Sequence, residues 1–171
     1  MLKETEAMYR VNRILRHPLW QGAMTQIEEA EKKRIYCRHD LTHLLDTARL
    51  AYIENLEKNL GLNKELLYAA ALLHDIGRGL EYTQGVPHDE AGCMLAGTIL
   101  QETGFCESER MEILQAISSH RREGEQAECR SECNLADLLY RADKGSRNCF
   151  YCKCGDTCKW SEETKNKEIK S

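Results

Sequence analysis

The chain has 171 residues, of which 42% are hydrophobic and only two are prolines, and its formal net charge is −4. This length suffices for one hydrophobic core, and the many Leu, Ala, Glu, Lys and Arg residues predict an all-α, single compact helical bundle. The negative charge excludes a global field that would attract nucleic acid or an anionic membrane, and no stretch approaches the roughly 20 apolar residues that span a bilayer.

Hydrophobic spacing and capping residues predict about seven helices. In chain order, we expect them at residues 3–16, 18–34, 39 or 40–60, 64–76, 87–103, 109–120 and 135–143. Asn63, Ser108 and Asn134 are the expected N-caps, and residues 28–34 are interpreted as a solvated charged face. Residues 78–86 are expected to form a loop over a pocket, and residues 121–130 an exposed loop. No repeat or β-hairpin signal is found.

Composition divides the chain into three parts. Residues 1–35 are expected to be N-terminal helices packed on the core, residues 36–147 a helical domain with the candidate ligands, and residues 148–171 a cysteine-rich segment with a charged tail. The first residues, Met1 to Glu6, contain no apolar segment of the kind found in secretion signals, so we expect a cytoplasmic protein. Its nine cysteines are then expected to be mostly reduced thiols.

His74 and Asp75, which follow the apolar run Ala69–Leu73, are the most informative residues. A carboxylate beside an imidazole in such a segment costs several kcal/mol unless a strong partner compensates it, and a metal cation is the commonest such partner. A single histidine in a helix is more often a hydrogen-bonded core or surface residue. The adjacent pair, however, favours a metal site.

Four further candidate ligands lie at predicted helix ends. His43 and His88 fall in first turns, whereas His120 and Asp143 fall in last turns. Antiparallel helices joined by short loops bring such ends to one side of a bundle. We therefore expect these side chains to share one pocket with the His-Asp pair.

In their order, these residues resemble the HD-domain metal-dependent phosphohydrolases, whose motif is His, then His-Asp, then a distant Asp. The matching positions are His43, the HDIG-type run from Leu72 to Arg78, and Asp143, within a resemblance that covers roughly residues 38–147. It implies a helical bundle of the HD-domain type.

The resemblance also implies the metal ligands. His43, His74, Asp75 and Asp143 are expected to hold one divalent ion, while two further histidines hold a second ion in two-metal members. That extra pair looks like His88 and His120. A two-metal site is therefore expected, with the Asp of the His-Asp pair bridging the ions. Imidazole and carboxylate ligands suit Fe, Mn, Zn, Co or Ni.

The implied activity is hydrolysis of a phosphomonoester or phosphoanhydride, with a nucleotide as the small-molecule substrate. The chain is similar to small bacterial members that cleave nucleotide polyphosphates, including the diadenosine tetraphosphate hydrolases. Two ions in such a site activate a water molecule and polarise a phosphoryl oxygen. The alternative is a non-catalytic metal or redox sensor, which the completeness of the ligand set disfavours. A homodimer is left open.

Four more residues are candidates for binding and catalysis. Arg78 and Lys144 are expected to contact the substrate phosphate during catalysis, and Arg147 is expected to help bind it; the alternative for each is a surface cation. His39 is expected one helical turn before His43, where it could orient a metal ligand or protonate a leaving group. As a plain helix-terminal residue it needs neither role.

The C-terminal cysteines form a second constellation, because Cys149, Cys152, Cys154 and Cys158 lie within ten residues. A thiol cluster of this density indicates a soft metal. The preferred ligand set joins Cys37 to Cys149, Cys152 and Cys158, with Cys154 as the alternate ligand, and both structural zinc and an iron–sulfur cluster fit. Cys93, Cys106, Cys129 and Cys133 are interpreted as thiols that bind no metal, with the alternative that Cys129 and Cys133 form a helix-spaced extra pair of ligands. The tail, residues 161–171, is expected to be mobile.

Overall fold

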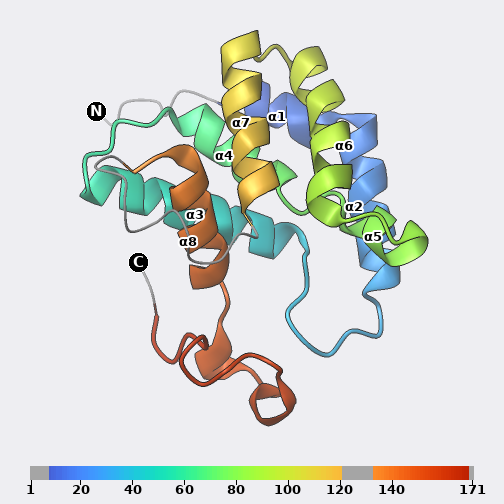
Figure 1. The fold of residues 1–171 in the computed structure, drawn as a ribbon, viewed down its shortest axis with the longest axis vertical. Coiled ribbons are helices and arrows are strands. Elements are labelled where there is room, and N and C mark those ends of the chain that lie inside the picture. The colour runs from blue at the N-terminus through green and yellow to red at the C-terminus, as the bar shows by residue number, and fades with distance from the viewer. Residues whose placement is uncertain (1–7, 121–132, 170–171) are drawn as a thin grey trace, which may run out of the picture.

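The computed structural model describes residues 8–120 and 133–169, and this part of the chain contains α-helices and two short 3₁₀ helices but no strand (Figure 1). The α-helices are α1 (Tyr9–Arg16), α2 (Pro18–Ala30), α3 (Leu41–Glu57), α4 (Lys64–Leu73), α5 (Arg78–Gln84), α6 (His88–Thr103), α7 (Glu107–Ser119) and α8 (Leu135–Gly145). The predicted all-α fold is confirmed. No described helix has both the length and the apolarity needed to cross a membrane.

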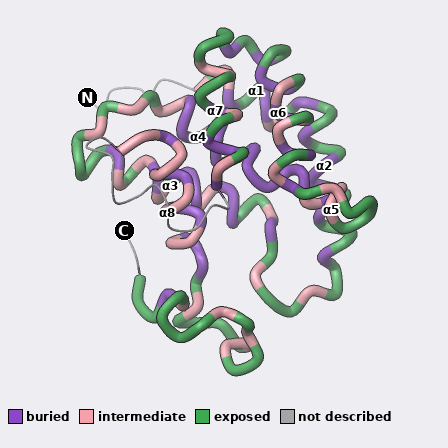
Figure 2. Tube along the Cα trace, viewed as in Figure 1, coloured by how far each residue is buried: buried purple, intermediate pink, exposed green. Residues whose placement is uncertain are grey.

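Helix α4 lies at the centre of the bundle and packs against α1, α3, α7 and α8. Its residues from Leu66 to Leu73 are buried except Tyr68, so it is apolar around most of its circumference, as expected of a core helix. Figure 2 shows the buried segments gathered around this helix. Val11, Ile14 and Trp20 belong to the same core, so α1 and α2 pack on the rest of the bundle as one hydrophobic unit.

Local capping chemistry fixes several helix ends. The side chains of Asn63 and Asn134 accept hydrogen bonds from the first turns of α4 and α8, as the sequence predicts. The expected cap at Ser108 is wrong, because α7 begins earlier, at Glu107, with Cys106 as the N-cap. The Glu109 carboxylate reaches back across the first turn and accepts a hydrogen bond from the Cys106 backbone N–H at 2.9 Å. This bond favours a helix that begins directly after Cys106.

Residues 78–84 form helix α5, so the expectation of a loop over the pocket is wrong. The Gly77 carbonyl accepts hydrogen bonds from Leu80 and Glu81, and the helix ends at Gly85, which has a φ of 73°. Packing against α2 supports this short helix because Gly79 is buried beside Gln26. The predicted exposed loop at residues 121–130 lies outside the described residues.

The segment after α8 lies at one end of the bundle and contains the 3₁₀ helices η1 (Cys149–Tyr151) and η2 (Gly155–Thr157) (Figure 1). The expectation of a mobile tail is wrong for residues up to 169. Asn166 is buried, and its Nδ2 donates hydrogen bonds to three backbone carbonyls, of Lys144 at 2.7 Å, Gly145 at 3.2 Å and Arg147 at 2.8 Å. This side chain docks the tail on the end of α8.

Candidate metal centre

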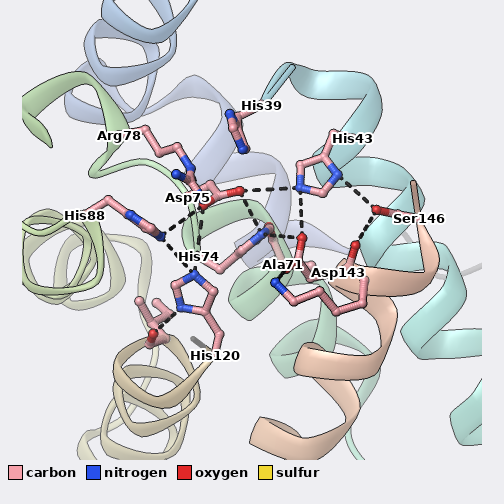
Figure 3. Close-up of polar contacts among 12 residues, drawn as sticks. His39, His43, Ala71, His74, Asp75, Arg78, His88, His120, Asp143 and Ser146 are labelled. Carbon is pink, nitrogen blue, oxygen red and sulfur yellow. Dashed lines mark hydrogen bonds and ion pairs between the residues drawn. The ribbon is translucent and has the colours of Figure 1, made fainter. Parts of the chain in front are cut away.

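Six buried side chains meet where helix ends converge near the middle of the bundle (Figure 3). Short connections and antiparallel packing bring these ends together, as the sequence analysis expects. The residues are His43 in the first turn of α3, His74 and Asp75 at the end of α4, His88 at the start of α6, His120 after α7 and Asp143 in the last turns of α8.

The first group consists of His43, His74, Asp75 and Asp143. The Nε2 atom of His43 lies 3.4 Å from Asp75 Oδ2 and 3.3 Å from Asp143 Oδ1. The Nε2 atom of His74 lies 3.1 Å and 3.6 Å from the same two oxygens. Ligand atoms bound to one ion at about 2.1 Å stand roughly 3–3.4 Å apart in tetrahedral or octahedral arrangements, so this spacing fits a single ion.

The second group shares Asp75 with the first and adds His88 and His120. Asp75 Oδ1 lies 3.5 Å from His88 Nε2 and 3.9 Å from His120 Nε2. The two Nε2 atoms are 3.2 Å apart. Each group thus uses a different oxygen of the same carboxylate, so Asp75 could contribute a ligand to each of two ions.

Hydrogen bonds at Nδ1 orient all four histidines toward the ion positions. The acceptors are Ala71 O for His74, Ile117 O for His120, Glu81 Oε2 for His88 and Ser146 Oγ for His43. Ser146 accepts here because its hydroxyl donates to the Asp143 carbonyl at 2.8 Å. With Nδ1 protonated, a neutral ring presents its Nε2 lone pair toward an ion, which is the tautomer that metal binding requires.

Two atoms of this centre have no hydrogen-bond partner although they are buried: His74 Nε2 and Asp75 Oδ2. Leaving such an atom unsatisfied costs about 1–3 kcal/mol. The facing lone pairs of His88 and His120 add repulsion. Divalent cations would satisfy all of these atoms, and imidazole with carboxylate is a donor set that transition metals prefer. The residues therefore fit a pair of divalent ions.

The charges in the centre are strongly coupled. Burial lowers the pKa of His74, but Asp75 and Asp143 raise it more, to about 10. Burial and the neighbouring positive charge of His74 lower the pKa of His120 to about 4. Burial raises the pKa of Asp75, but His74 and Arg78 outweigh it, so that this pKa lies well below its usual range. Both carboxylates are therefore anionic at neutral pH and available as ligands.

His39 lies in the segment before α3 rather than on the helix, because Asp40 is the N-cap. Its ring packs edge-on against His43, and its Nδ1 donates a hydrogen bond to Glu31. The Tyr82 hydroxyl donates to the same carboxylate at 2.6 Å. Glu31 is only 3% exposed, so the interpretation of residues 28–34 as a solvated face is wrong at this position. Sequence reasoning missed Glu31, because its partners come from distant segments.

The three expected phosphate-binding cations all contact the centre. Arg78 Nε donates to Asp75 Oδ1 at 2.8 Å, and Lys144 Nζ lies 3.2 Å from Asp143 Oδ2. Arg147 donates to His43 Nε2 at 3.2 Å and lies 3.4 Å from Asp143 Oδ1. Arg147 is buried, so the alternative of a surface cation does not hold for it.

A cavity of about 540 Å³ extends from the centre to the C-terminal segment. Two aromatic side chains, Tyr36 and Trp160, line it beside His39. Its cationic lining residues are Arg34, Arg78, Lys144, Arg147, Lys159 and Lys165. The expected cysteine ligands Cys37, Cys149, Cys152 and Cys158 line the same cavity, whereas Cys154 is absent from its lining. Among the missed residues, Arg34, Lys159 and Lys165 carry no local signal that would distinguish them from surface cations.

The remaining cysteines lie away from this cavity where the structure describes them. The Cys93 thiol contacts the Leu114 carbonyl at 3.6 Å, and the Cys133 thiol accepts from Arg141. Cys106 serves as the N-cap of α7. Cys129 lies outside the described residues.

The helical bundle and its paired histidine–carboxylate groups are typical of a metal-binding protein. The HD domain family matches residues 40–148, and the chain belongs to this family. An uncharacterized protein of Clostridium beijerinckii is 42% identical over 162 residues, which cover 95% of this chain and 99% of that protein. Ribonuclease Y of Aster yellows witches'-broom phytoplasma is 32% identical over 113 residues, which cover 66% of this chain but only 20% of that enzyme.

The fold is also similar to a solved structure. The crystal structure of a predicted HD superfamily hydrolase from an uncultured Thermotogales bacterium matches with a TM-score of 0.58 and 25% sequence identity. The match covers 84% of this chain and 79% of that chain. The protein is therefore a member of the HD domain family with a histidine–aspartate cluster suited to metal binding.

Proposed function

We propose that this protein is a metal-dependent phosphohydrolase that cleaves a phosphomonoester or phosphoanhydride bond of a nucleotide. The observation that carries the proposal is the cavity, which joins two ion positions to six cationic side chains. A cationic cavity inside a chain of net charge −4 selects small, highly charged anions. Phosphate groups have the charge and the oxygen geometry that arginine and lysine bind best.

The bound ions would supply an activated water molecule and neutralise charge on the phosphoryl group. The protein's own residues position the substrate. Arg78 and Lys144 each contact a ligand carboxylate while lining the cavity, so their remaining N–H groups are available to phosphate oxygens. Arg147 is held by His43, by Asp143 and by the Arg38 carbonyl at 3.2 Å. Its fixed guanidinium braces the ion site and contributes positive charge near the phosphate.

In this proposal His39 donates a proton to the leaving oxygen. Its Nδ1 is bound to the Glu31 carboxylate, which leaves Nε2 for the cavity that the ring lines. Burial lowers the pKa of His39 although Glu31 opposes this effect. Donation from Nε2 requires the doubly protonated ring, which the Glu31 carboxylate favours and burial opposes.

The aromatic side chains favour a nucleotide over a simple phosphate ester. Tyr36 and Trp160 line the cavity together with the cations, and Trp160 lies 6.0 Å from Lys144 Nζ, measured to the ring centroid. Aromatic rings stack on nucleobases with about 1–3 kcal/mol per base. One cavity therefore offers a surface for the base and cations for the phosphates.

A phosphate-release screen over nucleoside mono-, di- and triphosphates and dinucleoside polyphosphates tests the proposal. Asp75→Asn keeps the shape of the bridging side chain but removes its charge, so we expect loss of metal binding and of at least about 1,000-fold in kcat. Asp46→Asn, on the same helix as His43 but outside the centre, is the matched control and should retain activity.

Three results would contradict the proposal. Hydrolysis that Asp75→Asn leaves unchanged would exclude the metal centre as its source. A metal-loaded wild type that is inert toward the whole panel would favour the alternative of a metal or redox sensor. A short oligoribonucleotide belongs in the panel because ribonuclease Y matches over this segment. Its cleavage by a protein that spares mononucleotides would overturn the assignment of a nucleotide substrate.

A further inference from the structure

The cavity has a second wall, made of cysteine thiols, that the metal centre does not use. We call Cys37, Cys149, Cys152 and Cys158 the thiol wall; all four are unpaired thiols and all four line the cavity. The first lies before α3, and the other three follow α8. Two segments separated by more than a hundred residues therefore present thiols to one space.

Hydrogen bonds hold the two segments beside each other. The Tyr36 hydroxyl, next to Cys37 in the chain, donates to the Thr157 carbonyl, next to Cys158, at 3.1 Å. Within the C-terminal segment, Lys165 Nζ donates to the Gly155 carbonyl at 2.8 Å. The juxtaposition of the thiols thus agrees with a direct contact between the two segments.

The C-terminal segment has a defined path but no core of its own. No residue from 148 to 165 is buried, although this segment contains η1 and η2. Short segments without a hydrophobic core depend on disulfides or bound metal for their structure. The cysteines that the structure describes are all free, so a disulfide does not serve here. A bound metal group would supply the missing support.

The spacing of the thiols distinguishes two kinds of metal group. Thiolates that share one zinc ion at about 2.3 Å stand roughly 4 Å apart. Within the described residues, no three thiols have sulfur atoms within 4.8 Å of one another. Thiolates bound to different iron atoms of a cluster stand farther apart, and a cluster needs space between them. The cavity provides that space.

The electrostatic surroundings agree with closely placed thiols. Burial raises the pKa of Cys37, Arg147 lowers it, and the charges of Cys149, Cys152 and Cys158 raise it. Arg147 supplies positive charge to this part of the cavity.

We propose that Cys37, Cys149, Cys152 and Cys158 bind one iron–sulfur cluster of the four-iron type, which joins the segment before α3 to the segment after α8. Cys154 is excluded as a ligand because it does not line the cavity. This inference does not depend on the substrate or on the phosphohydrolase activity.

Anaerobic purification of the full chain, with assays for iron, zinc and acid-labile sulfide and a visible absorption spectrum, tests the inference. We expect about four sulfides per chain in the wild type. Cys37→Ser and Cys149→Ser should lose the sulfide and the visible absorption, whereas the matched control Cys154→Ser should retain both. Helical content by circular dichroism should stay unchanged, because the thiol wall lies outside the hydrophobic core.

Sulfide is the decisive readout because the helix-end centre also fits iron. Asp75→Asn should remove metal from that centre and leave the sulfide content unchanged, so failure of the two proposals can be told apart. Zinc without sulfide at the thiol wall would overturn the cluster. Full sulfide content in Cys37→Ser, or equal loss in Cys154→Ser, would overturn the ligand assignment.

Discussion

Gly77 holds the turn between α4 and α5 against the first turn of α6. A Cβ atom on residue 77 would lie 2.1 Å from the His88 carbonyl oxygen and 2.5 Å from the Gly92 backbone nitrogen. Both neighbours are backbone atoms and cannot rotate away. Gly77→Ala must therefore move α6 away from the end of α4 until the first contact reaches at least 3.0 Å.

This movement acts directly on the metal centre, because His88 Nε2 lies 3.5 Å from Asp75 Oδ1. Overpacking of this kind lowers the free energy of unfolding by about 1–3 kcal/mol. A displacement of about 1 Å at a reacting group costs about 100-fold in rate. We therefore expect Gly77→Ala to be less stable by about 2–3 kcal/mol and to lose about 100-fold in kcat.

Urea unfolding followed by circular dichroism measures the first effect, and titration with Mn²⁺ measures the number of ions bound. The control is Gly97→Ala on α6, where a new Cβ would meet no atom within 4 Å. That substitution should stabilise the protein by about 0.5–1 kcal/mol. If Gly77→Ala unfolds at the urea midpoint of the wild type and binds the same number of ions, the reasoning fails.

Three further predictions concern hydrogen bonds that sequence alone does not reveal. Burial raises the pKa of Glu31, but hydrogen bonds from His39 and Tyr82 lower it to about 2. The ionised Glu31 carboxylate therefore stabilises the folded protein by about 3 kcal/mol above pH ~4.5, and this contribution is lost as pH falls toward 2. Glu31→Gln should abolish that part of the pH dependence in urea unfolding. Ser146→Ala removes the acceptor for His43 Nδ1 and should weaken metal affinity about 10–100-fold in calorimetric titration, with unchanged helical content. Asn166→Ala should release the tail, seen as faster limited proteolysis there at an unchanged urea midpoint; equal proteolysis would refute this docking.

Most of the bundle is predictable because its signals are local. The caps Asn63 and Asn134 act within one turn, and the apolar spacing of each helix records the face that it buries. The pair His74 and Asp75 stands out because it interrupts an apolar run. These local signals were enough to place all six candidate ligands at helix ends.

The features that escaped prediction depend on contacts between distant segments. Helix α5 has no clear apolar stripe, and its Gly79 is buried against Gln26 of α2. Glu31 is buried because Tyr82, 51 residues later, and His39 donate to it. Ser146 differs from any exposed serine only in facing His43. Tertiary packing determines the burial and the contacts of all these residues, so sequence periodicity does not predict them.

The cavity illustrates why net charge is a poor guide to the ligand. Its six lining cations come from segments between Arg34 and Lys165, and Asp143 is the one acidic residue among its described lining. Because the whole chain has a formal charge of −4, the part outside the cavity is strongly negative. A long polyanion would have to extend over that negative surface, whereas a small one fits entirely within the positive field. The charge distribution thus favours a nucleotide over a nucleic acid, although the net charge alone indicates attraction to neither.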